Sequence, residues 1–235
     1  DNAKLSKRNG EVSIAWYRDK GFLPEAICNY LALLGWSPGD DRENVTMKEL
    51  TELFTVEKVH SSPARFDMKK LEAINGDKIR ALTIDEFLDW SLPFLTKAGV
   101  VSGSADEIAL VKLALPLIQE RIIMLSEVPA MLKFLFVKNF AVEADSVAKI
   151  TDDASKQVLE RSLKELEPLA TWTHESIEAA LRSSLIEEMG LKPRIAFGAV
   201  RIATTGSTIS PPLFESMELL GKEASLARIR AGIKL

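Results

Sequence analysis

The first eight residues carry a compact group of cations around one hydroxyl. Lys4, Lys7 and Arg8 surround Ser6 in the run Lys-Leu-Ser-Lys-Arg. An ammonium group on a flexible stem is a mobile point charge, and such groups stabilise negative charge that develops on phosphate oxygens in a transition state. The run therefore indicates a phosphate-binding loop, although a short cationic run is also typical of a solvated tail.

A second group of chemically capable side chains lies near the C-terminus. Arg201 supplies a planar fork of donors, Ser210 supplies a hydroxyl at an expected helix start, and Pro211, Leu213 and Phe214 are apolar. Unpaired nucleic-acid bases are read by stacking and by hydrogen bonds to their edges, and stacking is worth about 1–3 kcal/mol per base. The group indicates a base-binding pocket. Leu213 and Phe214 are also candidates for the core face of the helix that they begin.

Helix start and stop signals recur along the chain and predict the elements that must position these groups. Capping boxes, proline at the first helical position and glycine after the last apolar turn mark the ends. Strand signals are weak, so we expect a mainly α fold. The expected helices cover residues 24–34, 46–54, 83–95, 104–121 with a kink at Pro116, 173–190, 194–204 and 210–221.

Composition restricts the kind of protein. The formal net charge is −4, which argues against binding nucleic acid by bulk electrostatics alone and requires a local basic surface instead. His60 and His174 are too isolated for a metal site, and we expect the single cysteine, Cys28, to be an inert core thiol. No apolar stretch approaches the about 20 residues that span a bilayer. We expect a cytoplasmic protein without a membrane partner.

The order of several motifs resembles one family, the glutamyl-tRNA synthetases of bacteria. The cationic run is followed by Gly-Phe-Leu-Pro-Glu-Ala-Ile-Cys-Asn-Tyr-Leu-Ala-Leu-Leu-Gly-Trp-Ser at positions 21–37. Further matching segments are residues 62–67, 70–75, 201–206, 210–215 and 219–223. Ala73 departs from the pattern, because many members carry tryptophan there; we interpret this as a change in packing.

The resemblance implies an organisation in four parts. Residues 1–20 would be the tail of a catalytic domain with a KMSKS-type loop, and residues 21–82 a helical stem-contact unit. Residues 83–144 and 145–235 would be two helical subdomains of an all-α anticodon-binding region. A class I synthetase of this kind ligates glutamate to tRNA(Glu) through a glutamyl-adenylate, using ATP and Mg²⁺.

The resemblance also implies that this chain is the C-terminal part of such an enzyme. The nucleotide-binding Rossmann half with its His-Ile-Gly-His-like signature does not occur in the sequence. We therefore expect no complete catalytic set, no bound cofactor, a monomer, and tRNA binding without catalysis.

Residue roles follow from the same resemblance. Lys4, Ser6 and Lys7 would contact the ATP phosphates. Arg121 would face the third anticodon base, where an arginine is associated with accepting tRNA(Glu) and refusing tRNA(Gln). The group of Arg201, Ser210, Pro211, Leu213 and Phe214 would receive the first two anticodon bases. Arg182 could touch the loop backbone, although a solvated role is favoured for it.

Two alternatives remain open at this stage. The chain could be a stand-alone helical module that binds nucleic acid or another partner without a catalytic parent. Alternatively, it could belong to a synthetase of relaxed specificity that also charges tRNA(Gln).

Overall fold

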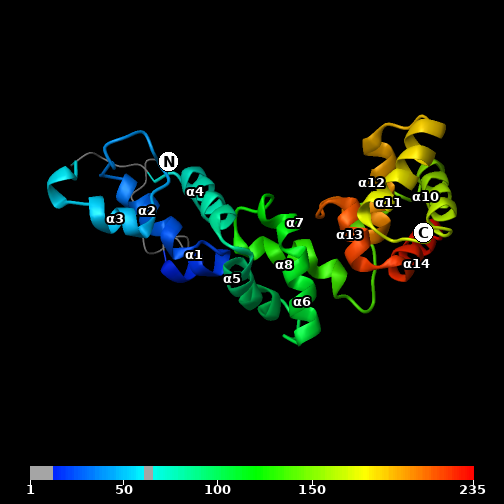
Figure 1. Cartoon of the computed structure of the whole chain (residues 1–235), viewed down its shortest axis with the longest axis horizontal. Coiled ribbons are helices and arrows are strands. Elements are labelled where there is room, and N and C mark those ends of the chain that lie inside the picture. Colours follow the sequence, from blue (N-terminus) through cyan, green and yellow to red (C-terminus); the bar gives the residue numbers. More distant parts are fainter. Residues whose placement is uncertain (1–12, 61–65) are drawn as a thin grey trace. The chain divides into compact units, whose positions relative to one another are not determined.

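The structure, a computed structural model, describes residues 13–60 and 66–235. The regular elements of these residues are helices, and no strand occurs among them, which confirms the mainly α fold. The chain divides into two compact units (Figure 1): Asp1–Lys97 with Ile118–Pro129, and Ala98–Leu117 with Ala130–Leu235. The division into four parts stays a prediction.

The three helices predicted for the first unit begin within one residue of the expected positions, whereas the helices Ile14–Lys20 and Met68–Ala81 were not predicted. Pro24 is the first residue of α2, and a complete capping box between Thr46 and Glu49 starts α3. Thr83 and Glu86 exchange hydrogen bonds at the start of α5. The elements are α1 (Ile14–Lys20), α2 (Pro24–Leu33), α3 (Met47–Leu53), η2 (Val56–Lys58), α4 (Met68–Ala81), α5 (Ile84–Lys97) and η3 (Leu125–Glu127).

A buried amide ties α4 to the loops of the first unit. The side chain of Asn75 accepts a hydrogen bond from the Leu23 N–H at 2.8 Å and donates to the Ile123 carbonyl at 2.6 Å. Gly21 lies close to Leu125 with a φ of +85°, and an added Cβ would lie 2.6 Å from the Leu125 nitrogen. Only glycine fits this position, because both the conformation and the close approach exclude a side chain.

The second unit is a helical assembly around one apolar core. α10 and α14 pack along each other, and α12 packs on both. The core includes Leu159, Leu181, Val200 and Ile229, each fully buried. The elements are α6 (Ala105–Ala114), η4 (Lys133–Leu135), α9 (Ala144–Val147), α10 (Asp153–Leu166), α11 (His174–Leu181), η5 (Arg182–Glu188), α12 (Pro193–Thr205), α13 (Leu213–Leu220) and α14 (Lys222–Ile233).

Two of the expected helices are interrupted. α6 ends at Ala114, and the short helix α7 (Pro116–Gln119) follows; another short helix, α8 (Val128–Leu132), comes after η3. The missing N–H of Pro116 and its ring explain the first interruption, so the predicted kink is confirmed. The helix expected to reach Gly190 changes from α to a π-helical segment at Arg182. This change cannot be read from periodicity alone.

A buried arginine holds the C-terminal end of α12. The Arg228 guanidinium donates to the Thr204 carbonyl at 2.7 Å and to the Phe134 carbonyl at 2.8 Å, and it lies 3.9 Å from the ring centre of Phe140. Burial lowers the pKa of Arg228 to about 10, so the group is still charged at neutral pH. The carbonyls and the ring face together stabilise this charge.

One expectation about a single side chain is wrong. Cys28 is exposed rather than a core thiol. It lies on a helix whose buried side is determined by tertiary packing, which residue type alone does not reveal. In the part of the chain that the structure describes, no helix is long and apolar enough to cross a membrane.

Candidate nucleic-acid interface

Arg201, Ser210 and Pro211 lie together in the second unit. Nη1 of Arg201 donates to the Ser210 hydroxyl oxygen at 2.6 Å and to the Pro211 carbonyl at 3.0 Å. Arg201 lies on α12, which begins with Pro193 and ends at the left-handed cap Gly206. The loop after this cap returns the chain to the arginine. Arg201 thus fixes the start of the next helix and also lines a pocket.

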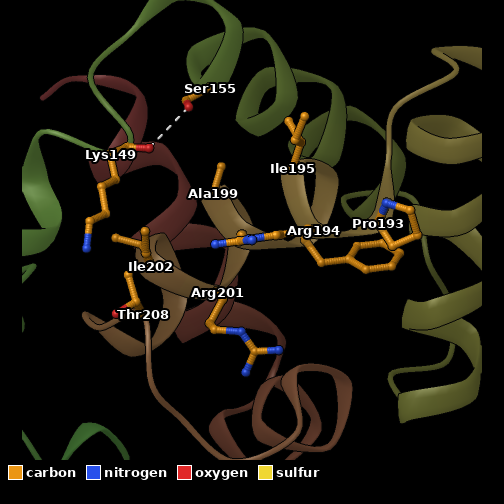
Figure 2. Close-up of a pocket in the computed structure, with 11 residues that line it drawn as sticks. Lys149, Ser155, Pro193, Arg194, Ile195, Ala199, Arg201, Ile202 and Thr208 are labelled. Carbon is orange, nitrogen blue, oxygen red and sulfur yellow. Dashed lines mark hydrogen bonds between the residues drawn. The ribbon is translucent and has the colours of Figure 1, made fainter.

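That pocket has a volume of about 760 Å³ and a cationic lining. Lys149, Arg194 and Arg201 line it, and no aspartate or glutamate is among the described residues of its wall. Figure 2 shows the two arginines on α12 and Lys149 on the segment before α10. A concave surface with three cations and no carboxylate is suited to a polyanion such as an RNA backbone.

One of the residues of α12 that line the pocket, Gly198, carries no side chain. Arg194, Gly198 and Arg201 follow at helical spacings of four and three residues, so they share one face. A Cβ added at Gly198 would meet no atom within 4 Å, so space is open above the helix. A planar group can approach the backbone closely here.

Apolar side chains border the cationic pocket. Ile195 lines it and is 56% exposed, and Ile209, next to Ser210, is 74% exposed. Exposed isoleucines beside arginine donors offer apolar surface for the face of a base, while the arginines offer hydrogen bonds for its edge.

Leu213 and Phe214 pack in or against the core of the second unit, whereas the sequence predicted them on the rim of a binding pocket. Leu213 is only 4% exposed and belongs to the core of the unit. Phe214 is half-buried and meets Phe197 edge to face, with 5.2 Å between the ring centres. The short helix α13 has to bury one side against α11, which explains why these apolar residues point inward.

Phe197, which also lines the pocket, contacts the side chain of Arg182. The Arg182 guanidinium lies 5.7 Å from the ring centre of Phe197 and pairs with Glu178 at 2.6 Å. Arg182 therefore has a carboxylate partner on its own helical stretch, in line with the solvated role favoured from the sequence.

His174 joins α11 to α13. Its Nδ1 lies 2.7 Å from a carboxylate oxygen of Glu218, and its backbone N–H donates to the same oxygen at 3.2 Å. The hydrogen bond to Glu218 is the main reason that the pKa of His174 is raised. This pair supports the helix that carries Phe214.

Arg121 belongs to the first unit. It is exposed in the turn after α7, and the structure gives its side chain no partner among the described residues. The neighbouring Gln119 donates to the carbonyls of Ile79 and Leu82, at 2.9 Å and 2.8 Å, which fixes the turn on the end of α4. Arg121 is thus an exposed cation on an anchored turn, and not in the kinked helix where the sequence predicted it, because α7 ends at Gln119.

The remaining site residues lie outside the described part. Lys4, Ser6 and Lys7 fall within residues 1–12, so their role in ATP binding stays a prediction. Conversely, sequence reasoning missed Lys149 and Arg194. The seven-residue spacing of Arg194 and Arg201 was a usable signal for one shared helix face. Lys149 had no such signal, because only tertiary packing brings it to α12.

Comparison with known proteins identifies the class of this helical molecule. Residues 85–233 match the family model described as anticodon binding domain, and residues 1–73 match the catalytic domain of class I tRNA synthetases (E and Q). The class is therefore that of the class I aminoacyl-tRNA synthetases.

The particular relatives narrow this class. The chain is 48% identical over 233 residues to the glutamate–tRNA ligase of Saccharopolyspora erythraea, covering 98% of this chain and 46% of that protein. It is also 48% identical to the Nocardioides enzyme, covering 99% and 48%. The chain belongs to the anticodon-binding-domain family of the glutamate–tRNA ligases, and it spans about half the length of these relatives.

Solved structures agree with this assignment. A glutamate tRNA ligase from Elizabethkingia meningosepticum superposes with a TM-score of 0.80 at 25% identity, covering 100% of this chain and 49% of that one. The glutamate-tRNA synthetase of Elizabethkingia anophelis gives 0.77 at the same identity and coverage.

Proposed function

We propose that this chain is the C-terminal, tRNA-binding part of a cytoplasmic, monomeric glutamate–tRNA ligase, and that the pocket on α12 receives the anticodon loop of tRNA(Glu). One observation carries the proposal: Arg201, which the buried Ser210 and Pro211 hold by hydrogen bonds, lines a pocket with two further cations, inside the segment that matches the anticodon-binding family.

The chemistry of this site is recognition rather than bond making. Lys149 and Arg194 suit the loop phosphates, since cations that neutralise phosphates supply most of the affinity for RNA. Arg201 suits the edges of bases, because its hydrogen bonds to Ser210 and Pro211 orient the planar guanidinium. Gly198 lets a base or ribose approach the helix. In the first unit, Arg121 suits the third anticodon base.

The whole enzyme would ligate glutamate to tRNA(Glu) through a glutamyl-adenylate, with ATP as a substrate and Mg²⁺ bound to its phosphates. Mg²⁺ would offset phosphate charge during adenylate formation. Lys4, Ser6 and Lys7 would hold the phosphates from their loop. The 235-residue chain should bind tRNA and fail in ATP–pyrophosphate exchange; turnover by this chain alone would overturn the assignment of roles.

A gel-shift titration tests the proposed function. The chain is titrated against tRNA(Glu), tRNA(Gln) and a tRNA with an unrelated anticodon, at one fixed salt concentration. Preference for tRNA(Glu) supports the proposal. Equal affinity for tRNA(Glu) and tRNA(Gln) alone identifies the enzyme of relaxed specificity. Equal affinity for all three identifies a general nucleic-acid-binding module and contradicts the proposal.

A further inference from the structure

The buried cation of α14 is attached to the helix that carries the pocket, although it is not part of the pocket wall. Arg228 is 9% exposed and is not among the described residues that line the pocket on α12. Its Nη1 donates to the carbonyl of Thr204, near the end of α12, and its Nη2 donates to the carbonyl of Phe134 in η4. Because a guanidinium presents its donors in a rigid fork, one side chain fixes these two backbone segments relative to each other.

Two residues that precede α9 strengthen this attachment. The Glu143 N–H donates to the Gly206 carbonyl at 2.9 Å, and the Glu143 carboxylate is hydrogen-bonded to the side chain of Ser207. The Phe140 ring lies under the Arg228 guanidinium, and a Cβ added at Gly206 would lie 3.3 Å from this ring. We call Arg228, Phe140 and Glu143 the Arg228 clamp. The clamp holds the start of the loop that follows α12.

The same loop orients Arg201. Only two residues separate Ser207, which the clamp holds, from Ser210, and one of them is Thr208, which lines the pocket (Figure 2). Ser210 and Pro211 then accept the hydrogen bonds of the Arg201 guanidinium, at 2.6 Å and 3.0 Å. Because the loop is so short, a displacement of its start also displaces the two acceptors at its end.

We propose that Arg228 is a positioning residue for tRNA recognition, which acts through the loop after α12 and holds Ser210 and Pro211 where they orient the Arg201 guanidinium. The inference rests on the proposed function and adds a buried residue that does not line the pocket. An arginine that only stabilised the fold would affect binding whether or not Arg201 is present. A positioning arginine affects binding only through Arg201, and this difference can be measured.

A double-mutant cycle tests whether Arg228 acts through Arg201. Filter binding gives the dissociation constant for tRNA(Glu) of the unaltered chain, Arg228→Met, Arg201→Ala and the double variant. The temperature is one at which circular dichroism shows all four chains to be folded. Arg230→Met is the matched control on the same helix, since Arg230 pairs with Glu167 and is not among the described residues that line the pocket.

We expect Arg228→Met to weaken binding about tenfold when Arg201 is present and less than about twofold in the Arg201→Ala chain, because residues that share one set of contacts are coupled. Arg230→Met should change binding by less than about twofold. Equal losses with and without Arg201, or no loss in either chain, would overturn the positioning role. Unchanged binding by Arg201→Ala alone would contradict the proposed function as well, so this single variant distinguishes the two failures.

A measurement without RNA reports the position of Arg201 directly. The heteronuclear NOE of its Nε–Hε group, assigned by its absence in Arg201→Ala, shows whether the side chain is ordered on the fast timescale. We expect an ordered signal in the unaltered chain and in Arg230→Met, and a mobile one in Arg228→Met. Arg228→Lys keeps the buried charge but loses the fork, and it takes the place of Arg228→Met in both experiments if that variant does not fold. An Arg201 side chain that stays equally ordered in the folded variant would overturn the inference.

Discussion

At the scale of single residues, Arg201 has two roles, and one substitution would remove both of them at once. Its Nη1 holds Ser210 and Pro211, and its side chain lines the pocket. A loss of RNA affinity after its removal could therefore come from a lost contact or from a displaced loop. The two causes are separated by measuring stability and affinity together.

For Arg201→Ala we predict a loss of about 1–3 kcal/mol in binding of tRNA(Glu), because a specific contact to a base is removed. Filter binding measures the affinity, and thermal unfolding monitored by circular dichroism measures the stability. Arg230→Ala is the matched control, since Arg230 pairs with Glu167 and is not among the described residues that line the pocket. Unchanged affinity with a lowered melting temperature would leave Arg201 a purely structural residue.

For Arg121→Gln we predict a change in selectivity rather than a uniform loss. Binding of tRNA(Glu) should weaken by about 1–3 kcal/mol while binding of tRNA(Gln) changes less, so that the gap between the two narrows. The exposed turn that presents Arg121 is fixed by Gln119, and folding should be preserved. Equal losses for both tRNAs would reduce Arg121 to a general phosphate contact.

His174 makes the stability of the second unit depend on pH. Its pKa is raised in the folded protein by Glu218, above the ordinary value near 6.5. A raised pKa contributes stability that is fully present below the unfolded pKa and is lost as pH rises through the folded pKa. His174→Gln should therefore lower the melting temperature more at about pH 6 than at about pH 9. An equal effect at both values would show that the ion pair with Glu218 contributes nothing.

At the scale of elements, α12 depends on its glycines in opposite ways. Gly206 ends the helix with a φ of +86°, and an added Cβ would lie 3.2 Å from the Ala141 carbonyl oxygen. Gly198 lies inside α12, lines the pocket and has an ordinary helical conformation. No atom lies within 4 Å of the position that its Cβ would occupy. The first is needed for the fold and the second for access to the helix.

This difference predicts two outcomes from the same chemical change. Gly206→Ala should destabilise the chain by about 1–3 kcal/mol, because a strained left-handed residue and a close contact are created. Gly198→Ala should stabilise the helix by about 0.5–1 kcal/mol, yet weaken tRNA binding because a methyl group raises the pocket floor. Chemical denaturation and filter binding measure the two quantities. A Gly198→Ala chain with unchanged affinity would show that RNA does not approach α12 closely.

At the scale of the whole molecule, local signals allowed some of the helices to be predicted, whereas α1, α4, α10 and α14 were not predicted. Capping boxes at Thr46 and Ser104 and the break at Pro116 act within a few residues, so they can be read directly. The contact of Arg201 with Ser210 and Pro211 could be predicted from the sequence for the same reason, because only a short loop separates these residues. Lys149, by contrast, reaches α12 only through tertiary packing.

Burial was harder to predict than helix position. Leu213 was expected on a binding rim but lies in the core, and Cys28 was expected in the core but is exposed. In each case the residue type suits either location, and the outcome depends on which side of a helix its neighbours cover.

The central claim is that a locally basic pocket in a chain of net charge −4 binds the anticodon loop. The most direct test is the salt dependence of binding to an isolated tRNA(Glu) anticodon stem-loop, for the unaltered chain and for Arg194→Gln. We predict weaker binding by the variant, with a slope of log affinity against log salt reduced by about one. An unchanged affinity together with an unchanged slope would contradict the assignment of this pocket to the anticodon loop.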